Sequence, residues 1–322
     1  MSAHAVLEVV SPGALATLQD LGRSGWRRLG VPRCGALDPA LLRIANVLAG
    51  NEEGAVAIEF FVAGPTLKAV NEALQLGFAG DCLLTLVRVD GGRSTMQSWR
   101  SLTLMPGDSV RVGAPRSARA AYVAVAGLQV APVLGSASTY TRAQLGGHGG
   151  RALCAGDKLN VLSAAVKEGA PALQRLLRQP PLVSRAAIRV VPGPQADYFD
   201  AATLQAFFAT PYQVSAEADR MGVRLLGPAL RHRADKGSDI VSDATVPGAI
   251  QVPGNGQPIV LLADGQTAGG YPKIGTVISA DLPRLALAPI HSVLHFEAVT
   301  VAQAEAIART HEATLRDRKS VV

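Results

Sequence analysis

The stretch AIEFFVAGPTLKAVNEALQLGFAGDCLLTLV, residues 57–87, indicates the fold class. It contains short apolar runs at 57–62, 74–79 and 82–87, separated by segments with glycine, proline and polar residues. Apolar runs of this length between turn residues are typical of β-strands. Working outward, similar runs predict further strands at 6–10, 109–112, 121–126, 188–191 and 259–262. We therefore predict a mainly β protein with a few helices.

One helix is predicted between two clear end signals. Asp38 can accept hydrogen bonds from free backbone N–H groups, Pro39 suits the first helical position, and Gly50 suits the end. A second helix is expected near the C-terminal end, where Thr300 and Gln303 have the spacing of a capping box.

The sequence pattern changes between Leu162 and Pro181. Residues 165–179 can form a short helix, which Pro180 and Pro181 would end. We interpret this segment as a linker at 166–182 between an N-terminal β-rich domain, 1–165, and a C-terminal β-rich domain, 183–322. Exchange of strands between the two domains is compatible with this division.

Composition excludes several classes of protein. With 48% hydrophobic and 17% charged residues among 322, the chain can bury a large core. No run reaches the roughly 20 apolar residues of a membrane span, and the N-terminus has no signal-peptide pattern. The three cysteines form no CxxC pair, so we predict no metal site and a reduced, cytoplasmic protein. The net charge of +6 is scattered, which favours a solvated surface over nucleic-acid binding.

The stretch 247–275 carries the strongest signal of a functional site. A buried apolar strand, 259–262, leads directly into polar residues beside glycines, namely Asp264, Gln266, Thr267, Tyr271 and Lys273. A rigid strand end of this kind can present a site, and a tight hairpin with satisfied side chains is the alternative. The lysine lies outside any phosphate-binding P-loop pattern, because Pro272 precedes it and Ile274 follows it.

Other motifs leave two interpretations open. In TLQDLGR, 17–23, Asp20 and Arg23 can pair with each other and so fix the loop, or Arg23 can bind a carboxylate or phosphate. Arg220 and Arg224 can share a helical face or be surface charges. The segment VLGSAST, 133–139, can bind an anion or form an ordinary turn. His148 has no carboxylate or cysteine near it in the sequence, which favours a loop histidine over a catalytic base.

These motifs, in this order over residues 6–283, resemble the family that contains the C-type subunit of 5-oxoprolinase and allophanate hydrolase subunit 2. This biotin-dependent carboxyltransferase family is related to urea amidolyase. The resemblance implies two cyclophilin-like domains and a role as one subunit beside separate A-type and B-type chains. It also implies an ATP-dependent hydrolase complex that opens the lactam of 5-oxo-L-proline to give L-glutamate.

Two further functions stay open. One is a carboxyltransferase component of a urea carboxylase system, in which biotin would be the cofactor. This chain has no Ala-Met-Lys-Met biotin-carrier motif, so another chain would have to carry the biotin. The other is a non-catalytic regulator that binds a B-type partner resembling a kinase inhibitor.

The resemblance also supplies candidate site residues. Asp20, Asp264 and Lys273 are the candidate catalytic residues, with an aspartate orienting water or acting as base and Lys273 binding an anionic group. The candidate substrate-binding residues are Gln19, Arg23, Arg220, Gln266, Thr267 and Tyr271. The sequence departs from the family pattern at Gly265, where a bulkier residue is common, and at Ser242-Asp243, where Ser-Glu is common.

Overall fold

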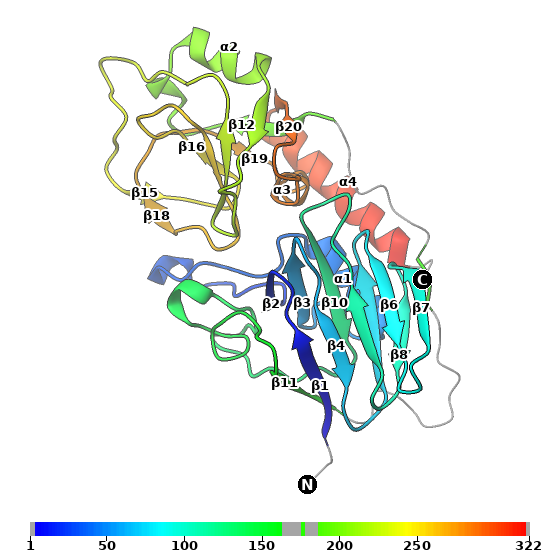
Figure 1. Cartoon of the computed structure of the whole chain (residues 1–322). Coiled ribbons are helices and arrows are strands. Elements are labelled where there is room, and N and C mark those ends of the chain that lie inside the picture. Colours follow the sequence, from blue (N-terminus) through cyan, green and yellow to red (C-terminus); the bar gives the residue numbers. More distant parts are fainter. Residues whose placement is uncertain (1–3, 163–174, 178–185, 320–322) are drawn as a thin grey trace. The chain divides into compact units, whose positions relative to one another are not determined.

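The computed structural model describes residues 4–162, 175–177 and 186–319 (Figure 1). Most of the regular structure is β-strand, which confirms the predicted mainly β class. The described part contains helices α1 (Pro39–Ala49), α2 (Ala201–Ala209), α3 (Leu282–Ala286) and α4 (Val301–Lys319). Short 3-10 helices are η1 (Arg27–Leu29), η2 (Thr141–Ala143) and η4 (Ala196–Tyr198).

The chain divides into two compact units. The first contains the described residues of Met1–Arg23, Cys34–Leu182 and Asp317–Val322, and the second contains the described residues of Ser24–Arg33 and Val183–Arg316. The loop that carries η1 therefore belongs with the C-terminal half of the chain. The predicted domain boundaries stay a prediction, because most of the linker at 166–182 lies outside the described residues.

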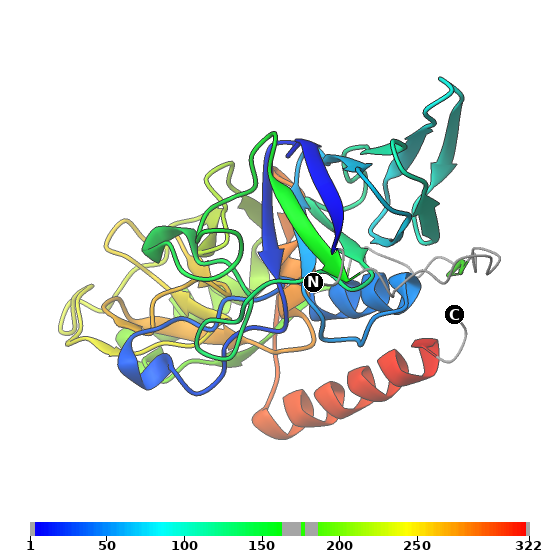
Figure 2. The same cartoon turned by 90° about the horizontal axis from the view of Figure 1, so that it is seen from below.

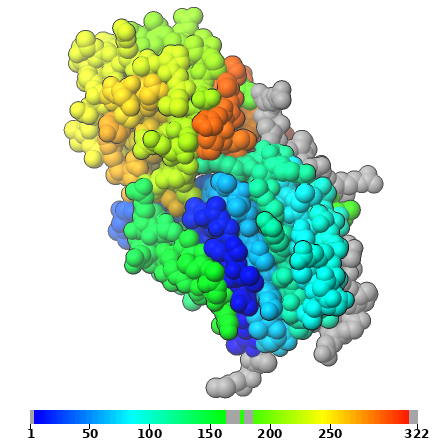
Figure 3. Space-filling view, in the orientation of Figure 1, coloured from blue at the N-terminus to red at the C-terminus, as the bar shows by residue number. Residues whose placement is uncertain are grey.

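The first unit contains two antiparallel sheets. The larger has the order β11 (Lys158–Leu162), β1 (His4–Ser11), β4 (Thr66–Ala69), β9 (Ser109–Val112), β6 (Leu83–Val87), β7 (Arg93–Gln97). The smaller has the order β2 (Leu15–Gln19), β3 (Ala57–Phe61), β10 (Ala120–Val125), β5 (Leu74–Ala79), β8 (Ser101–Leu104). Strand β1 pairs with β11 from the far end of the unit, and Figure 3 shows β1 as a dark-blue band beside this green segment.

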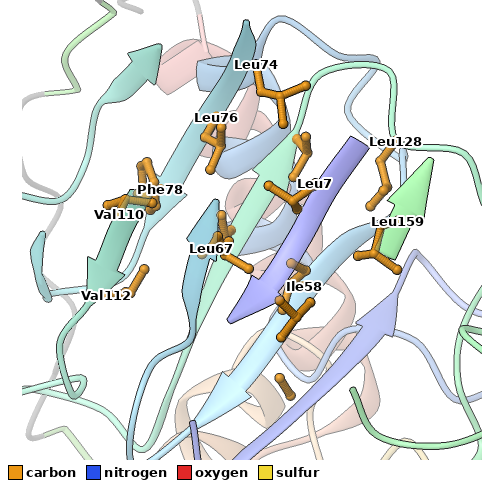
Figure 4. Close-up of a cluster of buried hydrophobic side chains, with 14 of the residues drawn as sticks. Leu7, Ile58, Leu67, Leu74, Leu76, Phe78, Val110, Val112, Leu128 and Leu159 are labelled. Atoms are coloured by element: carbon orange, nitrogen blue, oxygen red, sulfur yellow. The ribbon is translucent and has the colours of Figure 1, made fainter. Parts of the chain in front are cut away.

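The inner faces of both sheets share one core (Figure 4). Leu7 and Leu67 of the larger sheet and Ile58 of the smaller sheet are all fully buried within it. Helix α1 packs on the smaller sheet against β5 and β10 (Figure 2). Gly77 of β5 permits this close packing, since a Cβ there would lie 2.1 Å from the Ala45 carbonyl oxygen. Aliphatic side chains thus form most of this core.

Local end signals set the limits of helices α1 and α4, as predicted. The Asp38 carboxylate accepts hydrogen bonds from the backbone N–H groups of Ala40 and Leu41, and Gly50 ends α1 with a φ of 91°. Thr300 Oγ1 accepts from the Gln303 N–H at 3.2 Å, and Gln303 Oε1 accepts from the Thr300 N–H at 2.8 Å. This reciprocal pair is the predicted capping box.

The second unit is built on an eight-stranded sheet. Its order is β20 (Val293–Leu294), β13 (Tyr212–Val214), β14 (Gly222–Leu226), β17 (Ile259–Leu261), β16 (Ala249–Gln251), β19 (Lys273–Val277), β12 (Ile188–Pro192), β21 (Phe296–Ala298). A separate two-stranded ribbon pairs β15 (Asp243–Ala244) with β18 (Ala268–Gly269). On α2, Phe207 is fully buried and stacks on Phe296, with ring centroids 4.8 Å apart.

One local prediction and one of two open interpretations are wrong. Residues 175–177 of the helix predicted at 165–179 are extended, because the Ser101 N–H donates to the Arg175 carbonyl and the Leu177 N–H to that of Trp99. The remainder of that helix lies outside the described residues. Arg220 and Arg224 also share no helical face, since Arg224 lies in strand β14 and Arg220 just before it.

No helix in the described ranges is both long and apolar enough to cross a membrane.

Candidate functional site

In the first unit, Asp20 holds the segment 136–138 in place. Its carboxylate accepts hydrogen bonds from Ser136 Oγ at 2.6 Å, Ser138 Oγ at 2.5 Å and the Ala137 N–H at 2.6 Å. The Gly22 N–H donates a fourth, at 2.7 Å. These four bonds occupy both oxygens, so the structure favours a positioning role for Asp20 over a role as base. The predicted catalytic role stays a prediction.

Arg23 lies beside this hydrogen-bonded segment and is fully buried. Its Nη2 donates to the Ser138 carbonyl at 2.5 Å, while Nε and Nη1 are buried without a hydrogen-bond partner in the described part of the chain. Gln19 is also fully buried. Its Nε2 donates to the Thr139 carbonyl, and its Oε1 has no partner among the described residues. The cluster therefore retains unused donors on Arg23 and an unused acceptor on Gln19.

In the second unit, Arg220 and Asp264 form a buried two-point ion pair. Nε of Arg220 lies 3.0 Å from Oδ2 of Asp264, and Nη2 lies 2.8 Å from Oδ1. Each side chain is 7% exposed. Both carboxylate oxygens are thus engaged, which favours positioning the strand end over accepting a proton from substrate. The predicted base role of Asp264 stays a prediction.

A glutamine pair crosses the same loop. Gln251 Nε2 donates to the Gly270 carbonyl at 2.7 Å, and Gln266 Nε2 donates to Gln251 Oε1 at 3.1 Å. Thr267 takes part through its backbone, because its carbonyl accepts from the Thr245 N–H at 3.0 Å. Predicted residues Gln266 and Thr267 therefore lie in one hydrogen-bonded framework with Gln251, which the sequence analysis did not single out.

Lys273 is buried and paired with a carboxylate. Its Nζ lies 2.8 Å from Oδ2 of Asp243, and the two side chains are 4% and 48% exposed. Gln195 completes the group, because its Nε2 donates to the same oxygen at 3.2 Å. The pKa of Asp243 is lowered, chiefly by the hydrogen bond from Lys273, so this group is a carboxylate at neutral pH. Only the departure at Ser242-Asp243 pointed to this neighbour in the sequence.

Two residues beside this group have unusual features. Tyr271 has a φ of 74°, a left-handed conformation that is rare for a bulky residue, and its exposed fraction is 41%. Such backbone outliers are common at functional sites. Arg27, from the loop carrying η1, donates through Nη2 to the Thr245 carbonyl at 2.5 Å. No motif in the sequence pointed to this contact of Arg27.

His148 lies in a loop, as favoured, but a carboxylate lies close to it in space. Nε2 of His148 is 3.5 Å from Oδ1 of Asp157, whose two oxygens also accept from Arg151 at 2.7 Å. These bonds lower the pKa of Asp157 to about 2. A pocket of about 190 Å³ beside the loop is lined by His148, Lys158 and Asn160, among others.

The predicted site residues thus form two clusters, one in each unit. Gln19, Asp20 and Arg23 lie in the first, and the other six lie in the second. The sequence did not indicate Gln195 or Gln251 and indicated Asp243 only as a departure from the family pattern, because their partners lie elsewhere along the chain. Among the described residues, no group of three or more His, Cys, Asp or Glu is placed to hold a metal ion.

The family model for the carboxyltransferase domain, subdomain A and B, matches residues 29–298. The chain belongs to this family, which confirms the resemblance inferred from the motifs.

Several known proteins are similar over most of the chain. It is 37% identical over 292 residues to the C-type subunit of 5-oxoprolinase from Escherichia coli, covering 90% of each chain. It is 33% identical over 318 residues to the corresponding 5-oxoprolinase subunit of Haemophilus influenzae, covering 98% of this chain and 99% of that protein.

Two solved structures show the same fold. The urea amidolyase of K. lactis superposes with a TM-score of 0.85 at 26% identity over 97% of this chain. TTHA0988 superposes with a TM-score of 0.78 at 36% identity over 91% of this chain. Both are longer proteins, of which this chain spans 20% and 55% respectively.

Proposed function

We propose that this chain is the C-type subunit of an ATP-dependent 5-oxoprolinase. The complex would open the lactam of 5-oxo-L-proline to L-glutamate in the cytoplasm, together with A-type and B-type subunits. One observation carries the proposal, namely the 37% identity to a C-type 5-oxoprolinase subunit across 90% of both chains. ATP would supply the driving force for opening a stable amide and would be held by the assembled complex.

The unused hydrogen-bonding groups of the first unit support an amide ligand. A lactam presents a carbonyl oxygen that can accept from Arg23 and an N–H that can donate to Gln19 Oε1. The buried donors and acceptor of these two residues match that pair of groups. In this proposal Asp20 and Asp264 hold the adjacent segments of their own chain in position. Lys273 and Tyr271 contribute contacts to an anionic group in the second unit.

The test is ATP hydrolysis by the purified three-subunit complex, with and without 5-oxo-L-proline, with L-glutamate measured in parallel. We expect stimulation by the lactam and production of glutamate, both lost when this chain is omitted. An intact complex that shows no stimulation would contradict the proposal.

A second candidate is a carboxyltransferase component acting on urea. The family model and the TM-score of 0.85 to a urea amidolyase favour it. This function predicts a biotinylated partner chain and urea-dependent consumption of bicarbonate. Tight binding to a B-type partner without either activity would instead indicate the regulator.

A further inference from the structure

We propose that Lys273 and Gln195 form a binding site for a small carboxylate, and that the Asp243 side chain occupies this site until the ligand displaces it. The inference rests on the anionic group that the proposed function places at Lys273 and deepens it, because it names the ligand as a carboxylate and Asp243 as its competitor, and it requires no particular amide reaction. It concerns only the second unit, at the edge formed by β15 and β18 (Figure 1).

The two members of the ion pair are unequally buried. A buried ammonium group needs a counter-ion, since an unpaired charge in a protein interior is strongly unfavourable. Lys273 is such a group, with a side chain 4% exposed, but its partner Asp243 is 48% exposed. The lysine is thus fixed in the protein while its counter-ion faces solvent. Any carboxylate arriving from solvent can replace Asp243 without leaving Lys273 unpaired.

The two donors are oriented independently of Asp243. The Lys273 backbone N–H donates to Gln195 Oε1 at 3.2 Å, which fixes the direction of the Gln195 amide. Its Nε2 then points at Asp243 Oδ2, 3.2 Å away, where Lys273 Nζ also donates at 2.8 Å. Two donors therefore converge on one oxygen position. They would remain aimed there after the aspartate side chain rotates away.

Only the Asp243 side chain has to move for a ligand to take its place. Thr245, two residues further on, is held by its N–H on the Thr267 carbonyl at 3.0 Å and by its Oγ1 on the Gln266 carbonyl. Arg27 also donates to the Thr245 carbonyl at 2.5 Å. Strand β15 is thus anchored at its end, whereas the other oxygen of Asp243 accepts, within the described ranges, only from the adjacent Ala244 N–H. A rotamer change of Asp243 is sufficient for a ligand carboxylate to replace it, and exposed side chains make such changes rapidly.

The test is a calorimetric titration of the whole chain with acetate at constant ionic strength, which measures the acetate dissociation constant. Asp243→Asn removes the tethered carboxylate and should lower the acetate dissociation constant by roughly tenfold or more, because an intramolecular competitor acts at a high effective concentration. Adding Lys273→Met to this variant should abolish acetate binding. Asp235→Asn is the matched control, because Asp235 also pairs with a cation but both partners are exposed.

An equal acetate affinity for Asp243→Asn, Asp235→Asn and the unmodified chain would overturn the proposal. If Asp243→Asn does not fold, the unmodified chain still provides a test by NMR. Acetate should shift the side-chain amide resonance of Gln195, and this shift should be absent in Lys273→Met. An unchanged Gln195 resonance would overturn the proposal equally, and neither readout depends on ATP hydrolysis or on lactam opening.

Discussion

Arg220 and Asp264 are joined twice, by their side chains and by their backbones. The guanidinium contacts both carboxylate oxygens, at 3.0 and 2.8 Å, and the Asp264 N–H donates to the Arg220 carbonyl at 3.1 Å. One residue precedes β14 and the other follows β17, so the pair fixes the ends of two neighbouring strands to each other. The loop from Asp264 to Lys273 starts from this fixed point.

Breaking this pair should destabilise the protein strongly. In Asp264→Asn the buried Arg220 guanidinium loses the charge of this two-point carboxylate partner, so we expect a loss of about 3–5 kcal/mol in the free energy of unfolding. Asp235→Asn, which breaks an exposed pair with Arg233, should cost at most about 1 kcal/mol. Urea unfolding of both variants measures the difference. If Asp264→Asn is as stable as Asp235→Asn and yet inactive in the complex, Asp264 acts chemically.

Asp20 should be needed for the order of the segment that it clamps. Asp20→Ala leaves the hydroxyls of Ser136 and Ser138 and the Ala137 N–H without their acceptor. Each buried group that loses its partner costs about 1–3 kcal/mol. We expect faster hydrogen exchange at residues 136–139, measured by mass spectrometry, while strand β9 in the same unit keeps its protection. Uniform exchange rates in variant and unmodified chain would show that other contacts hold the segment.

The sequence predicted what depends on neighbours along the chain. Strands β5 and β9 have the predicted limits, and Asp38 and Gly50 set the ends of α1, because apolar runs and end signals act within a few residues. The site depends on distant pairs. Asp20 meets Ser138 across 118 residues, and Lys273 meets Asp243 across 30. These contacts form only when distant loops and strand ends meet in the folded chain, and a single sequence contains no direct signal of which segments meet.

The Asp157 carboxylate should titrate near pH 2. Hydrogen bonds from Arg151 are the main cause of its lowered pKa, which is about 2. Because the folded-state pKa is below the ordinary value of about 3.9, the stabilisation that the Arg151 pair gives to the folded protein is fully present above about pH 3.9. It is lost as the pH falls through about 2. A carbon-13 NMR titration of the Asp157 carboxyl gives the midpoint directly. A midpoint close to the ordinary value would show that the Arg151 pair does not persist in solution.

Arg23 should contribute to ligand binding rather than to stability. Its guanidinium is fully buried, makes one hydrogen bond to Ser138, and has no carboxylate partner among the described residues. A buried charge without a counter-ion is unfavourable, so Arg23→Met should leave the free energy of unfolding unchanged or raise it by about 1–4 kcal/mol. Lactam-stimulated ATP hydrolysis by the complex should fall by about tenfold to a hundredfold, which corresponds to the free energy of one lost charge-assisted hydrogen bond. Arg23→Lys, which keeps the charge but not the planar donors, should give an intermediate rate. The opposite pattern, a less stable variant with full activity per folded complex, would make Arg23 a structural residue, and the amide would then have to bind elsewhere.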